Sequence, residues 1–304
     1  MSGEILDWSR SALKLKLATG QIREIDVRHV LKVQTPKDPL IQQGLLRMEQ
    51  GDDRQAAELF RQAFLQKSNS GQRDWRLVEL LAFRVRCYVN LSDFDSALQC
   101  YGLLYQSSSD SAFMNCIPLV WTSCTTSPQL QKTAQNWLSS SPLSFLSLSG
   151  ASILLAGPRR NEVVESLKRL SRDNDSDIAQ LARFQLLRVQ LTELPVDELN
   201  RLSLEYQKIP IEYQSGPAFQ LGRLWNLSSD AQKSDRAALY YLKCAWNPHT
   251  DKPLAARALY SAGKILQDSG HQEEAVSVYH ELLQKYPKSE WATIVMQENK
   301  KTNE

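Results

Sequence analysis

The segment at residues 256–289, ARALYSAGKILQDSGHQEEAVSVYHELLQKYPKS, constrains the fold more than any other part of the chain. Its apolar residues recur at helical spacing on both sides of a tight turn, Asp268-Ser269-Gly270, and Pro287 ends the second helix. Two short amphipathic helices joined by a turn cannot bury their apolar faces alone. We therefore expect this unit to stack on neighbours, so that the rest of the chain also consists of helix pairs.

Small residues mark the places where the two predicted helices meet. Gly263 lies in the first helix and Ala275 in the second, and Tyr279 and Leu282 follow on one face. In these residues, and in the terminal Pro287, the segment resembles the tetratricopeptide repeat family, whose unit is a helix-turn-helix. The resemblance implies an all-α fold, a right-handed superhelical α-solenoid of stacked antiparallel helix pairs. It also implies a protein that holds other proteins.

Further copies of the unit are predicted at residues 37–70, at 78–111 and, in degenerate form, at 217–250. In the last of these, Gly222 and Ala237 stand fifteen rather than twelve residues apart, so the turn between the helices is longer. The serine-rich middle lacks the signature, but its interleaved apolar residues indicate structure rather than a disordered linker. There we expect short helices at 128–138, 142–155, 161–173, 177–194 and 196–209.

Four regions follow from these patterns: an N-terminal segment at 1–36, two repeats at 37–111, degenerate helical repeats at 112–210, and two C-terminal repeats with a capping helix at 211–304. The conformation of the first region is open. Leu13, Leu15 and Leu17 alternate with lysines, which suits a strand. We favour a helical cap, because a lone hairpin would have no sheet to join. Ser289 is expected to cap the last helix.

The composition excludes several classes of protein. The formal net charge of +2 does not predict a basic face for nucleic acid or an anionic membrane. The five cysteines are irregularly spaced and form no CxxC motif, which argues against a disulfide framework or a zinc site. We find no signal peptide and no apolar run long enough to span a membrane. These features favour the cytoplasm, or the periphery of the cell envelope if the N-terminus is incomplete.

No arrangement of residues predicts chemistry. The chain has no phosphate-binding loop and no GxSxG motif, and its four histidines stand apart. We therefore expect no catalytic residue, no cofactor and no metal, and predict that the protein is not an enzyme. Trp121, Trp137 and Trp225 are interpreted as core residues between helices.

If the resemblance holds, the functional surface is the concave wall formed by the first helix of each repeat. The family's geometry puts twelve residues there: Ile41, Leu45, Met48, Glu49, Ala82, Arg86, Val89, Asn90, Tyr260, Lys264, Gln267 and Asp268. This mixed wall suits a protein or peptide segment. A clamp for a C-terminal carboxylate is not expected, since only Arg86 and Asn90 are of a suitable type. The oligomeric state is open.

A second interpretation comes from the end of the best repeat. The sequence from Tyr286 to Ala292, YPKSEWA, looks like that of bacterial repeat proteins of the cell envelope. It suggests a bacterial protein and, as an alternative function, an accessory factor in envelope assembly or secretion.

Overall fold

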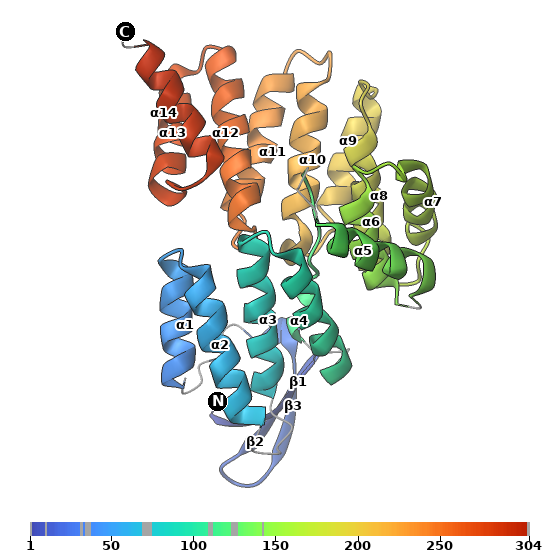
Figure 1. Ribbon diagram of the computed structural model, residues 1–304, viewed down its shortest axis with the longest axis vertical. Coiled ribbons are helices and arrows are strands. Elements are labelled where there is room, and N and C mark those ends of the chain that lie inside the picture. The colour runs from blue at the N-terminus through green and yellow to red at the C-terminus, as the bar shows by residue number, and fades with distance from the viewer. Residues whose placement is uncertain are drawn as a thin grey trace. The chain divides into compact units, whose positions relative to one another are not determined.

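The computed structural model describes residues 2–9, 11–30, 33, 38–68, 75–108, 112–122, 127–141 and 143–302. Helices dominate this part of the chain, as predicted, and they form antiparallel pairs in a solenoid-like arrangement (Figure 1). The chain divides into two compact units, Met1–Pro118 and Leu119–Glu304. The first two predicted regions fall in unit 1, and most of the remainder falls in unit 2.

Unit 1 contains two helix pairs, α1 (Pro39–Glu49) with α2 (Asp53–Ser68) and α3 (Trp75–Asn90) with α4 (Phe94–Ser107). The four helices pack in sequence order, each against the next (Figure 1). Short 3₁₀ helices follow the N-terminal strands (Val27–His29) and α4 (Ala112–Asn115). The two repeats predicted at 37–70 and 78–111 are thus present as helix pairs.

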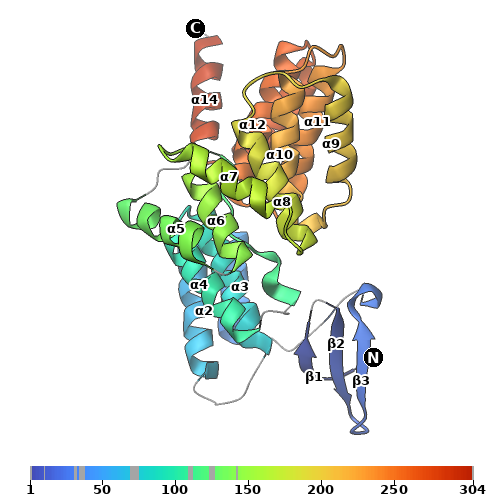
Figure 2. The ribbon, with the colours of Figure 1, turned by 90° about the vertical axis from the view of Figure 1, so that its right-hand side faces the viewer.

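The helical cap predicted for residues 1–36 is wrong. Strands β1 (Gly3–Trp8), β2 (Ala12–Leu17) and β3 (Ile22–Asp26) form an antiparallel sheet in the order β1-β2-β3, seen side by side in Figure 2. The alternating pattern of β2 was therefore a strand pattern: Leu13 and Leu15 are buried, while the lysine between them is exposed. A third strand supplies the sheet that a lone hairpin would lack.

The sheet is joined to unit 1 through an aromatic cluster. The ring of Trp8, at the end of β1, lies 5.7 Å from the ring of Trp75 in α3 and 5.2 Å from that of Phe113. Gly20, with φ of +82°, occupies the β2–β3 turn, where a side chain would be strained. The N-terminal segment is therefore a packed part of unit 1.

Unit 2 begins with the helices predicted without repeat signatures. These are α5 (Pro128–Ser140), α6 (Ser144–Leu154), α7 (Arg160–Leu170), α8 (Ser176–Leu186) and α9 (Val196–Tyr206), with 3₁₀ turns at Leu187–Val189 and Ile211–Tyr213. Two repeat-like pairs follow, α10 (Ser215–Asn226) with α11 (Lys233–Trp246) and α12 (Lys252–Asp268) with α13 (Gln272–Lys285), and α14 (Glu290–Thr302) ends the chain. The Ser289 hydroxyl accepts from the Ala292 amide, so the predicted cap of α14 is confirmed.

Three of the repeat pairs, α1–α2, α10–α11 and α12–α13, close where a glycine of the first helix faces an aromatic ring of the second. A Cβ added at Gly263 would lie 2.5 Å from the Tyr279 ring, and one added at Gly44 would lie 2.5 Å from Phe60. In the degenerate copy, a Cβ added at Gly222 would lie 2.9 Å from the Tyr241 ring. The absence of a side chain at these positions lets the two helices approach closely.

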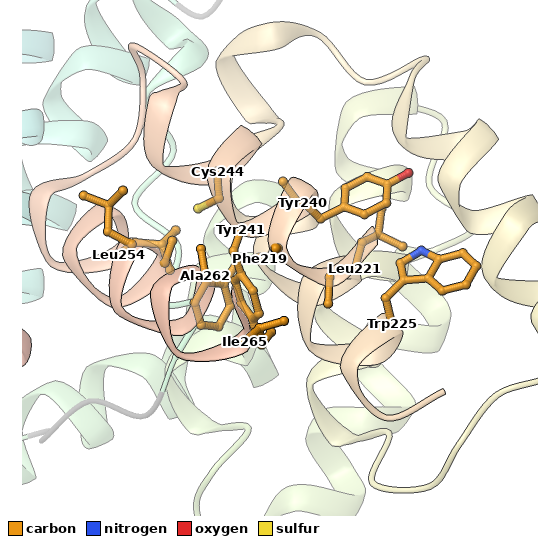
Figure 3. Packing of buried hydrophobic residues seen from close by; sticks show 14 of the residues in the cluster. Phe219, Leu221, Trp225, Tyr240, Tyr241, Cys244, Leu254, Ala262 and Ile265 are labelled. Carbon is orange, nitrogen blue, oxygen red and sulfur yellow. The ribbon is translucent and has the colours of Figure 1, made fainter. Parts of the chain in front are cut away.

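An extensive core cluster lies in unit 2 and includes residues of α10, α11 and α12 (Figure 3). Phe219 and Tyr241 meet edge to face there, with ring centroids 5.2 Å apart. Trp225 is 1% exposed, as predicted for a core residue, and the guanidinium of Arg236 covers its ring at 4.4 Å. Trp121 and Trp137 are half-buried, and Trp121 packs against this cluster from its edge.

Candidate protein-binding groove

For two residues of unit 1, the predicted position on an exposed wall is wrong. Ile41 and Ala82 are each 2% exposed and belong to the core, because their helices turn these positions toward the neighbouring helix. Leu45 and Met48 are half-buried against the core cluster of α1 and α2, whereas Glu49 is exposed. The apolar end of the predicted wall is thus largely occupied by packing.

The other predicted residues of α3 are half-buried: Arg86, Val89 and Asn90. The Asn90 amide donates to Asp53 Oδ1 at 2.9 Å, a contact that joins α3 to the start of α2. A buried polar contact of this kind positions helices. Asn90 therefore has a structural partner in α2.

The predicted residues of α12 give a different result, because three of them line one hollow. Tyr260, Lys264 and Asp268 lie on one face of α12, and they border a hollow of about 360 Å³ together with Lys233 and Tyr241 of α11. Asn226, Ser234, Ser261 and Ile265 complete its lining. Gln267 lies outside it and accepts a hydrogen bond from the Tyr279 hydroxyl at 3.3 Å. We call this the polar hollow.

The polar hollow holds both charges and aromatic surface. Lys264 Nζ lies 3.1 Å from Asp268 Oδ1, and the hydrogen bond and charge of Asp268 raise the pKa of Lys264. Burial, and next the charge of Glu298, raise the pKa of Tyr260, whose ring packs 5.0 Å from that of Trp291. Such a surface offers hydrogen bonds of both kinds and a flat apolar contact, which is the usual chemistry of peptide recognition.

A second hollow in unit 2, of about 290 Å³, was missed in the sequence. Its lining includes four arginines and two aromatic residues: Arg160, Arg188, Arg223, Arg257, Trp121 and Phe219. These residues come from α7, α8 with its 3₁₀ extension, α10, α12 and the segment before α5. We call this the arginine hollow.

The two hollows lie along the same faces of α10 and α12. On α12, Arg257 borders the arginine hollow, and Tyr260 and Lys264 border the polar hollow one and two turns later. On α10, Arg223 borders the arginine hollow and Asn226, one turn later, borders the polar hollow. Because residues three and four apart share a helix face, the two hollows follow each other along the faces of α10 and α12. We call the two hollows together the α10/α12 groove.

The arginine hollow is bordered by a segment without helix or strand, residues 119–122, of which Trp121 and Thr122 line it. The backbone of this segment is bound by side chains, much as a peptide ligand would be. The Val120 carbonyl accepts from Gln185 Nε2 at 3.1 Å and from Arg188 Nη1 at 2.7 Å. The Val120 amide donates to Ser152 Oγ at 3.1 Å.

The next two residues of this segment are held in the same way. The Trp121 carbonyl accepts from Gln220 Nε2 at 2.9 Å, and the Thr122 carbonyl accepts from Arg188 Nη2 at 3.2 Å. The Trp121 ring lies against Gly216, where an added Cβ would come within 1.9 Å of the indole. Side chains of α8, of the 3₁₀ turn after it and of α10 thus satisfy the backbone of a segment that belongs to no strand.

Comparisons with known proteins identify one repeat. Residues 257–289 match the tetratricopeptide repeat family model, which confirms the resemblance at the best unit. A segment of 61 residues, 18% of this chain, is 38% identical to Protein O-mannosyl-transferase TMTC2 of Homo sapiens. The corresponding protein of Mus musculus is 36% identical over 63 residues. The chain covers only 7% and 8% of the length of these two relatives.

Among solved structures, the chain is similar to PilW, described as a widely conserved type IV pilus biogenesis factor. The match covers 84% of this chain and 96% of that one, with 16% identity and a TM-score of 0.31. The bacterial origin suggested by the sequence stays a prediction. No helix within the described ranges is both long and apolar enough to cross a membrane.

Proposed function

We propose that the protein is a non-enzymatic scaffold that binds an extended segment of another protein along the α10/α12 groove. The tetratricopeptide repeat at residues 257–289 supports a protein-interaction role. The observation that carries the proposal is the binding of residues 119–122, whose carbonyls accept from Gln185, Arg188 and Gln220 beside the arginine hollow. Side chains that satisfy the backbone of a segment bordering a groove suit a peptide along the rest of it.

The groove also has the mixed character that peptide binding requires. Tyr260 offers an aromatic surface, and Lys264 and Asp268 offer opposite charges at its exposed end. Aromatic anchors supply most of the binding energy in such sites, while the charged rim orients the partner. A bound segment would pass from the arginine hollow to the polar hollow across α12.

The experiment compares the wild type with a Tyr260→Ala/Lys264→Glu variant in affinity capture from lysate of the source organism. We expect at least one partner to bind the wild type and to be lost with the variant. The matched control is Val276→Ala/Lys288→Glu, which removes an exposed apolar side chain and reverses the same charge on α13 and the following turn. Partners retained equally by all three proteins would contradict the proposal.

The alternative of an accessory factor in cell-envelope assembly or secretion is supported only by the YPKSEWA sequence from Tyr286 to Ala292. The cytoplasm is the other location that we propose. Cell fractionation separates the two. Recovery only in the cytosol would contradict the envelope role, and recovery with envelope membranes would contradict the cytoplasmic location.

A further inference from the structure

Arg257 is held in a fixed position without a hydrogen-bonding partner. Its guanidinium lies 5.6 Å from the ring centroid of Phe219 and 5.3 Å from that of Trp291. Within the described part of the chain it makes no hydrogen bond and no ion pair, although it lines the arginine hollow. Aromatic rings on the guanidinium orient it and cover its faces, which leaves the N–H donors at its edge for a ligand.

The neighbouring arginines add charge to the same hollow but are fixed by the backbone. Arg223 donates to the carbonyls of Gln190, at 2.8 Å, and of Leu187. Arg188 donates to the carbonyls of Val120 and Ser152, each at 2.7 Å. A carbonyl satisfies a donor without neutralising its charge, so both arginines keep a full positive charge beside the hollow.

The hollow is therefore positive, and no acidic residue is among the described residues that line it. Burial lowers the pKa of Arg257, and the charges of Tyr241 and then of Glu290 only partly offset this lowering. Since a guanidinium stays protonated in proteins, burial leaves a charge that attracts an anion strongly. At about 290 Å³ the hollow stands at the lower limit of ligand pockets and has room for one or two side chains.

We propose that the α10/α12 groove selects segments rich in aspartate and glutamate, and that Arg257 pairs with a carboxylate of the bound segment in the arginine hollow. This inference rests on the proposed function, since it names the chemical class of the partner. A planar guanidinium with two free N–H groups matches a carboxylate in bidentate geometry. The remaining arginines increase the attraction without competing for the same oxygens.

A peptide carboxylate fits the groove better than a nucleic-acid backbone does. A phosphate backbone requires a continuous basic surface along its path. Here the four arginines line one hollow, and the lysines of the next hollow are accompanied by a carboxylate, Asp268, which pairs with Lys264. A phosphate chain would meet that carboxylate, whereas an acidic peptide can place an uncharged or basic residue there.

The test selects displayed random twelve-residue peptides for binding to the whole protein. We expect wild-type protein to enrich peptides with aspartate or glutamate, and a fluorescein-labelled consensus peptide to bind at least about tenfold more weakly to Arg257→Gln. Arg257→Lys, which keeps the charge but loses the planar geometry, should lose less. The matched control is Arg201→Gln, which removes an arginine that pairs with Glu198 on the surface of α9 and should leave binding within about twofold.

The outcomes separate the inference from the function on which it rests. Enriched peptides without acidic residues that still require Tyr260 and Lys264 would overturn the inference and leave the groove as a binding site. The absence of any enrichment would contradict the proposed function itself. Displacement of the consensus peptide by millimolar inorganic phosphate, or tighter Arg257-dependent binding of a single-stranded oligonucleotide, would also overturn the inference. Far-UV circular dichroism of each variant confirms that it is folded.

Discussion

The contact between Gly263 and Tyr279 predicts that Gly263→Ala destabilises the protein when the Tyr279 ring is present and stabilises it when the ring is removed. In an isolated helix, Gly263→Ala would stabilise by about 1 kcal/mol, because alanine has the higher helix propensity. In the folded protein the new Cβ would lie 2.5 Å from the Tyr279 ring, well inside contact distance. Overpacking of this kind costs about 1–3 kcal/mol, so the net effect is a loss of up to about 2 kcal/mol in the free energy of unfolding.

Removal of the ring should reverse this result. In a Tyr279→Ala background the clash is absent, and Gly263→Ala should stabilise by about 1 kcal/mol. The coupling energy of the double-mutant cycle then equals the overpacking cost, about 1–3 kcal/mol. Urea unfolding followed by far-UV circular dichroism measures all four proteins, and the change is taken from the transition that responds to the Tyr279 substitution.

A control tests the propensity value separately. Gly102 lies within α4, where an added Cβ meets no atom within 4 Å, so Gly102→Ala should stabilise by about 1 kcal/mol. The reasoning is refuted if Gly263→Ala has the same effect with and without the Tyr279 ring. Such a result would mean that the two helices do not meet at this glycine.

Three further predictions follow from individual contacts. Ala275→Leu should lower the free energy of unfolding by about 1–3 kcal/mol by overpacking the α12–α13 contact, and an unchanged melting curve would contradict the repeat assignment. Burial raises the pKa of Asp251, the cap of α12, from 3.8 to about 6, so its protonated form is favoured by folding. The contribution of this raised pKa to the free energy of unfolding is complete below about pH 3.8 and is lost as the pH rises through 6. Urea unfolding at a series of pH values should show this fall. Asp251→Asn, which keeps the cap, should abolish the pH dependence. Gly216→Ala should displace the indole of Trp121, and an unchanged ¹⁹F spectrum of fluorotryptophan-labelled protein would show that the ring does not pack there.

The helix pairs could be predicted because their determinants are local. Gly263 and Tyr279 lie sixteen residues apart and define one pair, and Gly44 and Phe60 repeat that spacing. Helical periodicity and small residues at the closest approach are both readable in a window of this length. Even the degenerate copy, with Gly222 facing Tyr241, keeps the same closing contact despite its longer turn.

The N-terminal sheet was missed because its third strand has little pattern of its own. Leu13 and Leu15 of β2 alternate with lysines as a strand requires, but β3 is mostly exposed and carries Arg23 and Glu24. Pairing is supplied by the backbone register, in which Leu15 faces Arg23. A strand defined by its partner rather than by an apolar face leaves a weak signal in a single sequence.

The groove was predicted in part, for a similar reason. Tyr260, Lys264 and Asp268 were placed on the wall by the family's geometry, and in the structure they border one hollow; Arg257 lies one turn earlier on the same helix face and was not predicted. Arg188 and the segment at 119–122 are separated by more than sixty residues, and nothing local links them. Conversely, Ile41 and Ala82 were placed on the wall by family geometry alone, and their neighbours bury them.

The most direct test of the central claim is site-specific photo-crosslinking from within the groove. A photoreactive amino acid is placed at Lys264, in the polar hollow, and, as a control, at Val276, which is 65% exposed on α13. The account predicts a covalent adduct with a partner protein from position 264 that is absent from position 276 and is reduced by Arg257→Gln. Equal adducts from both positions, or none from position 264 while a partner is still captured, would show that binding occurs elsewhere on the molecule.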